Sequence, residues 1–134
     1  MGNCSTRYEN YLFMGVANFK QTKVYKLAFE QGMGIFSVTK NFPKEERYSL
    51  IDQIRRSSRS VCTNLAEAYR KKIYPANFIL KITDCDAENS ETGVWLDFSL
   101  ACNYITLEQH TLFVSRNEEI GRLLSHMRNN PGKY

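Results

Sequence analysis

Apolar residues recur at helical spacing in four stretches of this 134-residue chain. Steps of three and four residues keep apolar side chains on one side of a helix, whereas a strand would alternate every second residue. The predicted helices cover residues 19–39, 43–72, 75–104 and 107–128. The second has the most regular apolar stripe, which contains Ile51, Ile54, Ser58, Val61, Leu65 and Ala68. No stretch alternates for long enough to predict a sheet.

Residues that favour helix ends stand between these stretches. Pro43 suits a first helical turn, and Pro75 separates the second predicted helix from the third. Thr106 and Gln109 have the spacing of a capping box, and the residues 129–132 end the last helix. Four helices with short connections predict an all-α, antiparallel up-down four-helix bundle. We expect one domain over 18–130, a loosely ordered lead-in over 1–17 and a tail over 131–134.

Composition agrees with a compact domain. The chain is 43% hydrophobic and 24% charged, which argues against disorder, and its apolar runs are too short to cross a membrane. Its four cysteines include no C-x-x-C pair, and neither histidine has a nearby cysteine. We therefore expect no metal site, no cofactor, and free thiols in a reducing cytoplasm.

The third predicted helix is apolar on two sides. Its core stripe contains Asn89 and Thr92, which we interpret as hydrogen-bonding residues that fix the register of the bundle. The opposite side carries Val94, Phe98, Ala101 and Ile105, and Trp95 lies on an adjacent flank. One interpretation is that residues 1–17 cover this outer side. The other is that it forms an interface with further copies of the chain.

Charge is distributed unevenly along the sequence. Residues 44–81 hold nine Lys or Arg and four Asp or Glu, whereas residues 82–110 hold six acidic residues and no Lys or Arg. Helical geometry gathers Arg55, Arg56, Arg59 and Arg70 on one flank of the second helix, and Lys71 and Lys72 extend it.

Three interpretations of this basic flank stay open. The arginines are solvated, with some paired to Asp52 or Glu67. Alternatively, they pair across a subunit interface with Asp84, Glu88 and Glu91. In the third interpretation they bind nucleic-acid phosphates, because guanidinium groups hold phosphate oxygens in pairs.

Signals for enzymatic chemistry are weak. Gly32 and Gly34 lack the third glycine and the Lys-Ser/Thr of a phosphate-binding loop. Leu107 and Leu123 occupy the positions where a di-iron bundle would need glutamate before His110 and His126. An acidic flank alone is a poor acid–base catalyst. We expect the protein not to be an enzyme.

Several segments resemble one known family. They are Phe19–Ala28, Phe42–Leu50, Gln53–Val61 and Asn64–Glu67, together with Glu91–Leu96 and Glu119–Leu124. In this order they resemble the bacterial four-helix-bundle proteins encoded by intervening sequences in 23S ribosomal RNA genes. That family includes the accessory variability proteins of diversity-generating retroelements. Ala68 stands where the family usually has glycine.

The resemblance implies a ring-like homopentamer and, for retroelement members, a basic surface that contacts nucleic acid and a reverse transcriptase. It assigns Arg55 and Arg56 to the basic segment. The function predicted first is a non-enzymatic, pentameric accessory protein that binds the backbone of RNA or DNA and assists a reverse transcriptase. The alternative is a structural or protein-interaction oligomer whose basic and acidic faces pair across subunits, without a nucleic-acid role.

Overall fold

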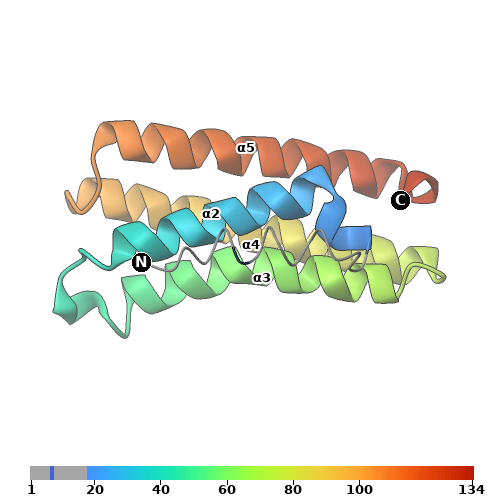
Figure 1. Ribbon diagram of the computed structural model, residues 1–134, viewed down its shortest axis with the longest axis horizontal. Coiled ribbons are helices and arrows are strands. Elements are labelled where there is room, and N and C mark those ends of the chain that lie inside the picture. Colours follow the sequence, from blue (N-terminus) through green and yellow to red (C-terminus); the bar gives the residue numbers. More distant parts are fainter. Residues whose placement is uncertain (1–6, 8–17) are drawn as a thin grey trace.

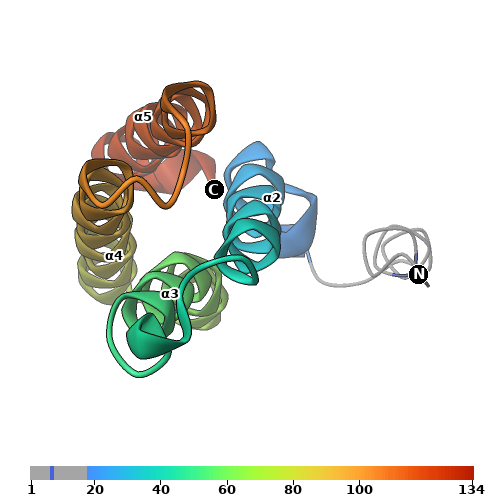
Figure 2. The ribbon, with the colours of Figure 1, turned by 90° about the vertical axis from the view of Figure 1, so that its left-hand side faces the viewer.

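The computed structural model describes residue 7 and residues 18–134, and this part of the chain forms an all-α four-helix bundle. The helices are α2 (Lys23–Thr39), α3 (Leu50–Arg70), α4 (Pro75–Ala101) and α5 (Leu107–Asn129). They run alternately up and down (Figure 1). Seen from one end, the four helices form a closed ring in chain order (Figure 2). Each helix therefore packs against two others, and α2 closes the ring by contacting both α3 and α5. The predicted fold class is confirmed. The expected lead-in over 1–17 lies outside the described residues.

Three helix ends differ from the predicted ones by three residues or more. The first helix starts at Lys23, after a 3-10 turn over Asn18–Gln21, and Thr22 caps it by accepting a hydrogen bond from the Tyr25 amide. The second starts at Leu50 instead of Pro43. A separate 3-10 turn over Lys44–Glu46 precedes it, because the chain must turn again to bury both Phe42 and Leu50.

The third helix ends at Ala101 instead of Tyr104. Asn103 adopts a positive φ of 62°, a left-handed conformation that asparagine tolerates better than most residues. The Tyr104 and Asn103 amides then donate to the carbonyls of Ser99 and Leu100, both at 2.9 Å. This is a Schellman ending, which satisfies carbonyl groups that the helix leaves unpaired. The capping box predicted at Thr106 and Gln109 is confirmed at the start of α5.

Two apolar clusters fill the interior, one towards each end of the bundle. One cluster contains Leu65, Phe78 and Ile120, and the other contains Ile35, Ile54 and Phe113. Ala68 is fully buried in the first cluster. All six residues of the predicted stripe of the second helix are buried. Beyond the last long helix, a 3-10 turn over Pro131–Lys133 brings Tyr134 against the first cluster.

A layer of buried polar residues accompanies the two clusters. Asn89 donates to the Asn117 carbonyl at 2.8 Å, and the hydroxyls of Thr92 and Ser57 lie 2.8 Å apart. Gln31 donates to the Phe113 carbonyl at 2.7 Å. These bonds join α4 to α5, α4 to α3, and α2 to α5. Asn89 and Thr92 thus make the interhelical hydrogen bonds predicted for them.

Glu46 connects two distant parts of the chain at one end of the bundle. Its carboxylate accepts hydrogen bonds from the Ser49 hydroxyl at 2.6 Å and from the Tyr104 hydroxyl at 2.9 Å. These two bonds hold the pKa of Glu46 below its ordinary value. The bond to Glu46 is also the largest cause that raises the pKa of Tyr104 to about 12.

Because the pKa of Glu46 is lower in the folded state, its contribution to stability is present above the unfolded carboxyl pKa of about 4.3 and is lost as the pH falls. We expect Tyr104→Phe to reduce the difference in unfolding free energy between about pH 7 and about pH 3. Urea unfolding at both pH values measures this difference. Tyr48→Phe is the control, because Tyr48 is 84% exposed. Equal changes in both variants would contradict the prediction.

Candidate nucleic-acid interface

The arginines of α3 project from two sides of the helix. Arg59 and Arg70 are eleven residues apart, which places them three turns apart on the same outer line, about 16 Å from each other. Arg55 projects from the side of α3 that faces α2. Arg56 points towards α4, as its partners there demonstrate. The arginines predicted to share one flank therefore face two different neighbouring helices, α2 and α4.

Three cations surround one aromatic ring where α2 and α3 meet. The Lys40 ammonium lies 4.7 Å from the centroid of the Phe36 ring, and the guanidinium carbons of Arg55 and Arg59 lie 4.8 Å and 5.6 Å from it. At such distances each cation is attracted to the ring. We call Lys40, Arg55 and Arg59 the cationic triad. Lys40 and Arg59 are exposed, whereas Phe36 and Arg55 are half-buried.

Arg55 is the anchored member of the cationic triad. Its Nε donates to the Thr39 hydroxyl at 2.8 Å, and its Nη2 donates to the Phe36 carbonyl at 3.4 Å. The Thr39 hydroxyl is itself held by the Ile35 carbonyl at 2.7 Å. Partial burial, and secondly the charge of Arg59, lower the pKa of Arg55. The guanidinium stays charged at neutral pH but lies in a field of like charge.

Arg56 is engaged within its own chain. Its guanidinium pairs with Glu88 at 3.1 Å and also with Glu91, and Glu91 accepts a further hydrogen bond of 3.0 Å from the Trp95 indole. Lys81 similarly pairs with Glu67 at 2.8 Å. Lys81 also lies 3.5 Å from Asp84. Asp84, Glu88 and Glu91 of α4 thus all pair with cations of the same subunit. Arg56 consequently lies apart from the other predicted phosphate-binding residues.

Arg70, Lys71 and Lys72 cluster at the carboxyl end of α3. All three are exposed. The Lys72 ammonium lies 5.1 Å from the centroid of the Tyr69 ring. Cations also suit this position because helix carbonyls make it electronegative. The structure therefore has two basic clusters along α3, one around Arg55 and Arg59 in its first half and one at its carboxyl end.

Sequence reasoning missed Phe36 and Lys40. Phe36 lies in the last turn of α2 and Lys40 caps the helix four residues later, so the sequence indicates that they share a face. Nothing in their spacing indicates that this face meets Arg55 and Arg59, since that depends on how α2 packs against α3.

An uncharged stripe runs along the exposed side of α4. Val94 and Phe98 are 50% and 54% exposed, and Ala101 is exposed as well. Trp95 is half-buried and packs against Phe98 with the ring centroids 5.9 Å apart. Steps of three and four towards the amino end reach five further exposed residues that the sequence analysis overlooked. They are Ala76, Leu80, Thr83, Ala87 and Ser90. We call these five residues with Val94, Phe98 and Ala101 the outer stripe.

Ile105 does not belong to the outer stripe, and its assignment to an oligomer interface was wrong. It is only 6% exposed and packs in the apolar cluster with Phe42, Leu96 and Phe113. The helix ends at Ala101, so Ile105 does not continue the periodicity of α4. The turn at Asn103 directs it into its own bundle instead.

The described thiols differ in exposure. Burial raises the pKa of Cys62 to about 12, and it also raises the pKa of Cys85. Both thiols are therefore protonated at neutral pH and are poor nucleophiles. Cys102 is exposed. In the described part of the chain, no three His, Cys, Asp or Glu side chains are grouped so that they could hold a metal ion.

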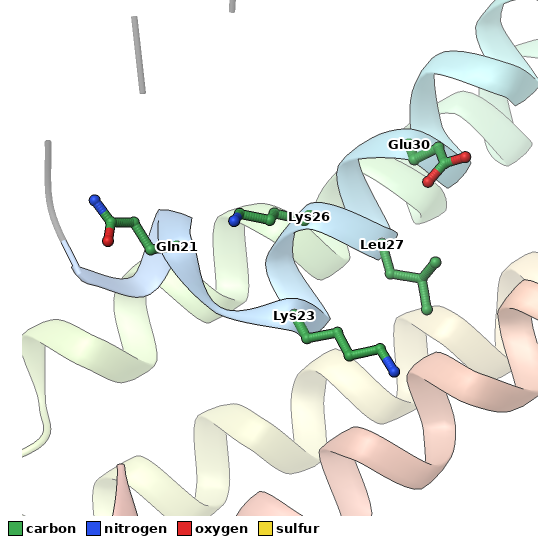
Figure 3. Close-up of a pocket in the computed structure, with 5 residues that line it drawn as sticks. All are labelled: Gln21, Lys23, Lys26, Leu27 and Glu30. Carbon is green, nitrogen blue, oxygen red and sulfur yellow. The ribbon is translucent and has the colours of Figure 1, made fainter. Parts of the chain in front are cut away.

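A surface depression lies along α2, lined by Gln21, Lys23, Lys26, Leu27 and Glu30 (Figure 3). Lys23 pairs with Glu119 of α5 at 2.8 Å, and Glu30 accepts a hydrogen bond from Arg116 at 2.8 Å. Two of its charged groups thus tie α2 to α5. The depression lacks a set of polar groups directed at a common point, so it is a weaker candidate than the cationic triad.

The fold and these surfaces define a small four-helix-bundle protein with two basic clusters and an uncharged outer face. Residues 20–126 match the family model described as 23S rRNA-intervening sequence protein. The chain therefore belongs to that family, as its motifs predicted.

A solved structure from Bacteroides thetaiotaomicron has the same fold, with a TM-score of 0.72 and 29% sequence identity. The match covers 79% of this chain and 95% of that one. That protein is described as one of unknown function from the S23 ribosomal protein family. No curated protein matches the chain. Among the described residues, no helix has the length and apolar character needed to span a membrane.

Proposed function

We propose that this protein is a non-enzymatic, self-associating protein of the cytoplasm that binds nucleic acid through its phosphates. The observation that carries the proposal is the cationic triad. Its three cations all lie within about 6 Å of the centre of the Phe36 ring. No carboxylate in residues 18–134 forms an ion pair with any of them. By contrast, Lys23, Arg56 and Lys81 all have carboxylate partners. Guanidinium groups bind phosphate oxygens through paired, charge-assisted hydrogen bonds.

Arg70, Lys71 and Lys72 extend the proposed binding surface. They lie at the far end of α3 from Arg55, so a strand that follows the helix would contact both basic clusters. Contacts of this kind read the backbone rather than the bases. We therefore expect weak sequence preference for either RNA or DNA, and strong dependence on salt.

Salt titration with matched arginine variants tests this proposal. We expect Arg59→Gln to lower the affinity for a single-stranded RNA several-fold and to reduce the dependence on salt, because one phosphate contact is lost. Arg59 is preferable to Arg55 as a target, since Arg55 also holds Thr39 and α2. Fluorescence anisotropy over a range of salt concentrations measures both effects.

Arg122→Gln is the matched control. Arg122 is exposed on α5, outside both basic clusters, and the variant changes the net charge by the same amount. If wild-type protein retains no nucleic acid at low salt, or if Arg59→Gln and Arg122→Gln bind equally, the nucleic-acid proposal is wrong.

Self-association is the second part of the proposal, and the outer stripe supports it. Eight uncharged residues follow one exposed side of a 27-residue helix, a length of about 40 Å. Six of the eight residues are apolar, and exposed apolar residues that follow one face of a helix are typical of an interface. The family resemblance suggests five copies, and it suggests a reverse transcriptase as a protein partner to test.

The alternative function is an oligomer in which basic and acidic faces pair across subunits. It needs Glu88 and Glu91 for a neighbouring copy, whereas both already pair with Arg56 of their own chain. In that alternative, Arg59→Gln would change the sedimentation of the protein. In the function proposed here, it leaves sedimentation unchanged and weakens nucleic-acid binding.

A further inference from the structure

The cationic triad gathers its three charges around a single aromatic ring. The three cationic groups lie 4.7, 4.8 and 5.6 Å from a single ring centroid. Arg59 and Arg70, by contrast, are separated by three helical turns. Cations spaced along a helix suit successive phosphates of a strand, each with one negative charge. Cations that converge suit one group with more than one negative charge.

Arg55 provides a fixed centre for such a group. Thr39 and the Phe36 carbonyl hold its Nε and Nη2, so the plane of the guanidinium is set before a ligand arrives. Its Nη1 makes no hydrogen bond in the described part of the chain and can donate outward. Lys40 and Arg59 are exposed at the end of long side chains. Both side chains are long enough to reach an anion that is bound at Arg55.

The charges of the cationic triad repel one another when no anion is present. Partial burial is the largest cause that lowers the pKa of Arg55, and the charge of Arg59 is the other. A bound anion would relieve this repulsion as well as gain hydrogen bonds. A phosphate monoester is the best match, because it has three acceptor oxygens and a charge of about −1.5 to −2 at neutral pH.

We propose that the cationic triad binds the terminal phosphate monoester of a nucleic-acid strand. This inference rests on the proposed function and specifies which group of the nucleic acid the triad recognises. A strand whose end lies on the triad can run along α3, where its internal phosphates would meet Arg70, Lys71 and Lys72. The protein would therefore distinguish strand ends from the interior of a strand.

The test uses one single-stranded RNA of about 12 nucleotides in three forms, a length within the usual range for single-strand sites. One form has a 5′-phosphate, one has a 3′-phosphate, and one has hydroxyls at both ends. Anisotropy at about 0.1 M salt measures the three affinities with the full-length protein. We expect a phosphorylated form to bind about tenfold more tightly than the form with hydroxyl ends. The 5′ and 3′ forms reveal which end is preferred.

Two single variants identify the residues responsible. We expect Arg59→Gln and Lys40→Gln to bring the preference for a phosphorylated end close to one. Both side chains are exposed, so neither variant should prevent folding. Arg70→Gln is the matched control, and we expect it to weaken binding to all three forms while preserving the preference.

The possible results separate this inference from the proposed function. If all three RNAs bind equally and with salt dependence, the terminal-phosphate inference is wrong and the proposed function stands. If none binds, both are wrong. Competition by millimolar inorganic phosphate against only the phosphorylated RNA would support recognition of a monoester. Tighter binding of a phosphopeptide than of any RNA would overturn the inference in favour of a protein ligand.

Discussion

Phe98→Asp is expected to convert the proposed assembly into monomers of 15.6 kDa. Phe98 is 54% exposed in the single subunit, so the substitution removes little that holds the bundle together. In an assembly built on the outer stripe, however, the new carboxylate would be buried without a partner. Burying an unpaired charge costs several kcal/mol, which exceeds what most small interfaces can tolerate. Val94→Asp should have the same effect.

Sedimentation velocity at a fixed protein concentration measures this result. Ser115→Asp is the control, because Ser115 is exposed on α5 and lies outside the outer stripe. It adds the same charge and should leave the assembly intact. Circular dichroism should give the same helical content for all three variants. A wild-type chain that sediments as a monomer would refute self-association, whatever the variants do.

Leu65→Ala is expected to lower the free energy of unfolding by about 2–5 kcal/mol, the largest stability effect that we predict. Leu65 is fully buried in the cluster that contains Val61, Phe78 and Ile120. Truncation removes favourable burial and leaves a cavity that close-packed neighbours fill only in part. A loss of this size is a large fraction of the stability of a typical domain.

Leu112→Ala is the matched control for this prediction. It is the same substitution within a helix, but Leu112 is 51% exposed. We expect a change within about 0.5 kcal/mol, as for most surface substitutions. Urea unfolding at equal protein concentration gives both values, since stability that includes assembly depends on concentration. Similar losses in the two variants would contradict the described core.

Much of the fold could be predicted from local pattern. The apolar stripe from Ile51 to Ala68 is buried throughout, and the capping box at Thr106 is present, because both depend on residues within a few positions of one another. Helix ends were less predictable. Pro43 permits a helix start, but the chain must first bury Phe42 and then turn. The helix end at Asn103 likewise depends on a backbone conformation that the apolar pattern does not report.

The candidate site could be predicted only in part. Helical spacing correctly placed Arg55 and Arg59 near each other, since they are one turn apart. It also grouped Arg56 with them, although Arg56 pairs with Glu88 and Glu91 across the boundary with α4. A helical wheel gives the direction of a side chain but not the residue that it meets. For the same reason, Ile105 was assigned to an outer surface and is instead buried.

The sequence by itself determined the number of helices, most of the residues that face the core and the unequal distribution of charge. These properties follow from the spacing of residues along one helix and from the chemistry of its ends. Only the tertiary structure decided which cations are neutralised. It joined Arg56 to the acidic flank of α4 and gathered Lys40, Arg55 and Arg59 around Phe36. Such pairings depend on how neighbouring helices are rotated and shifted against one another, which the packing of the whole core sets.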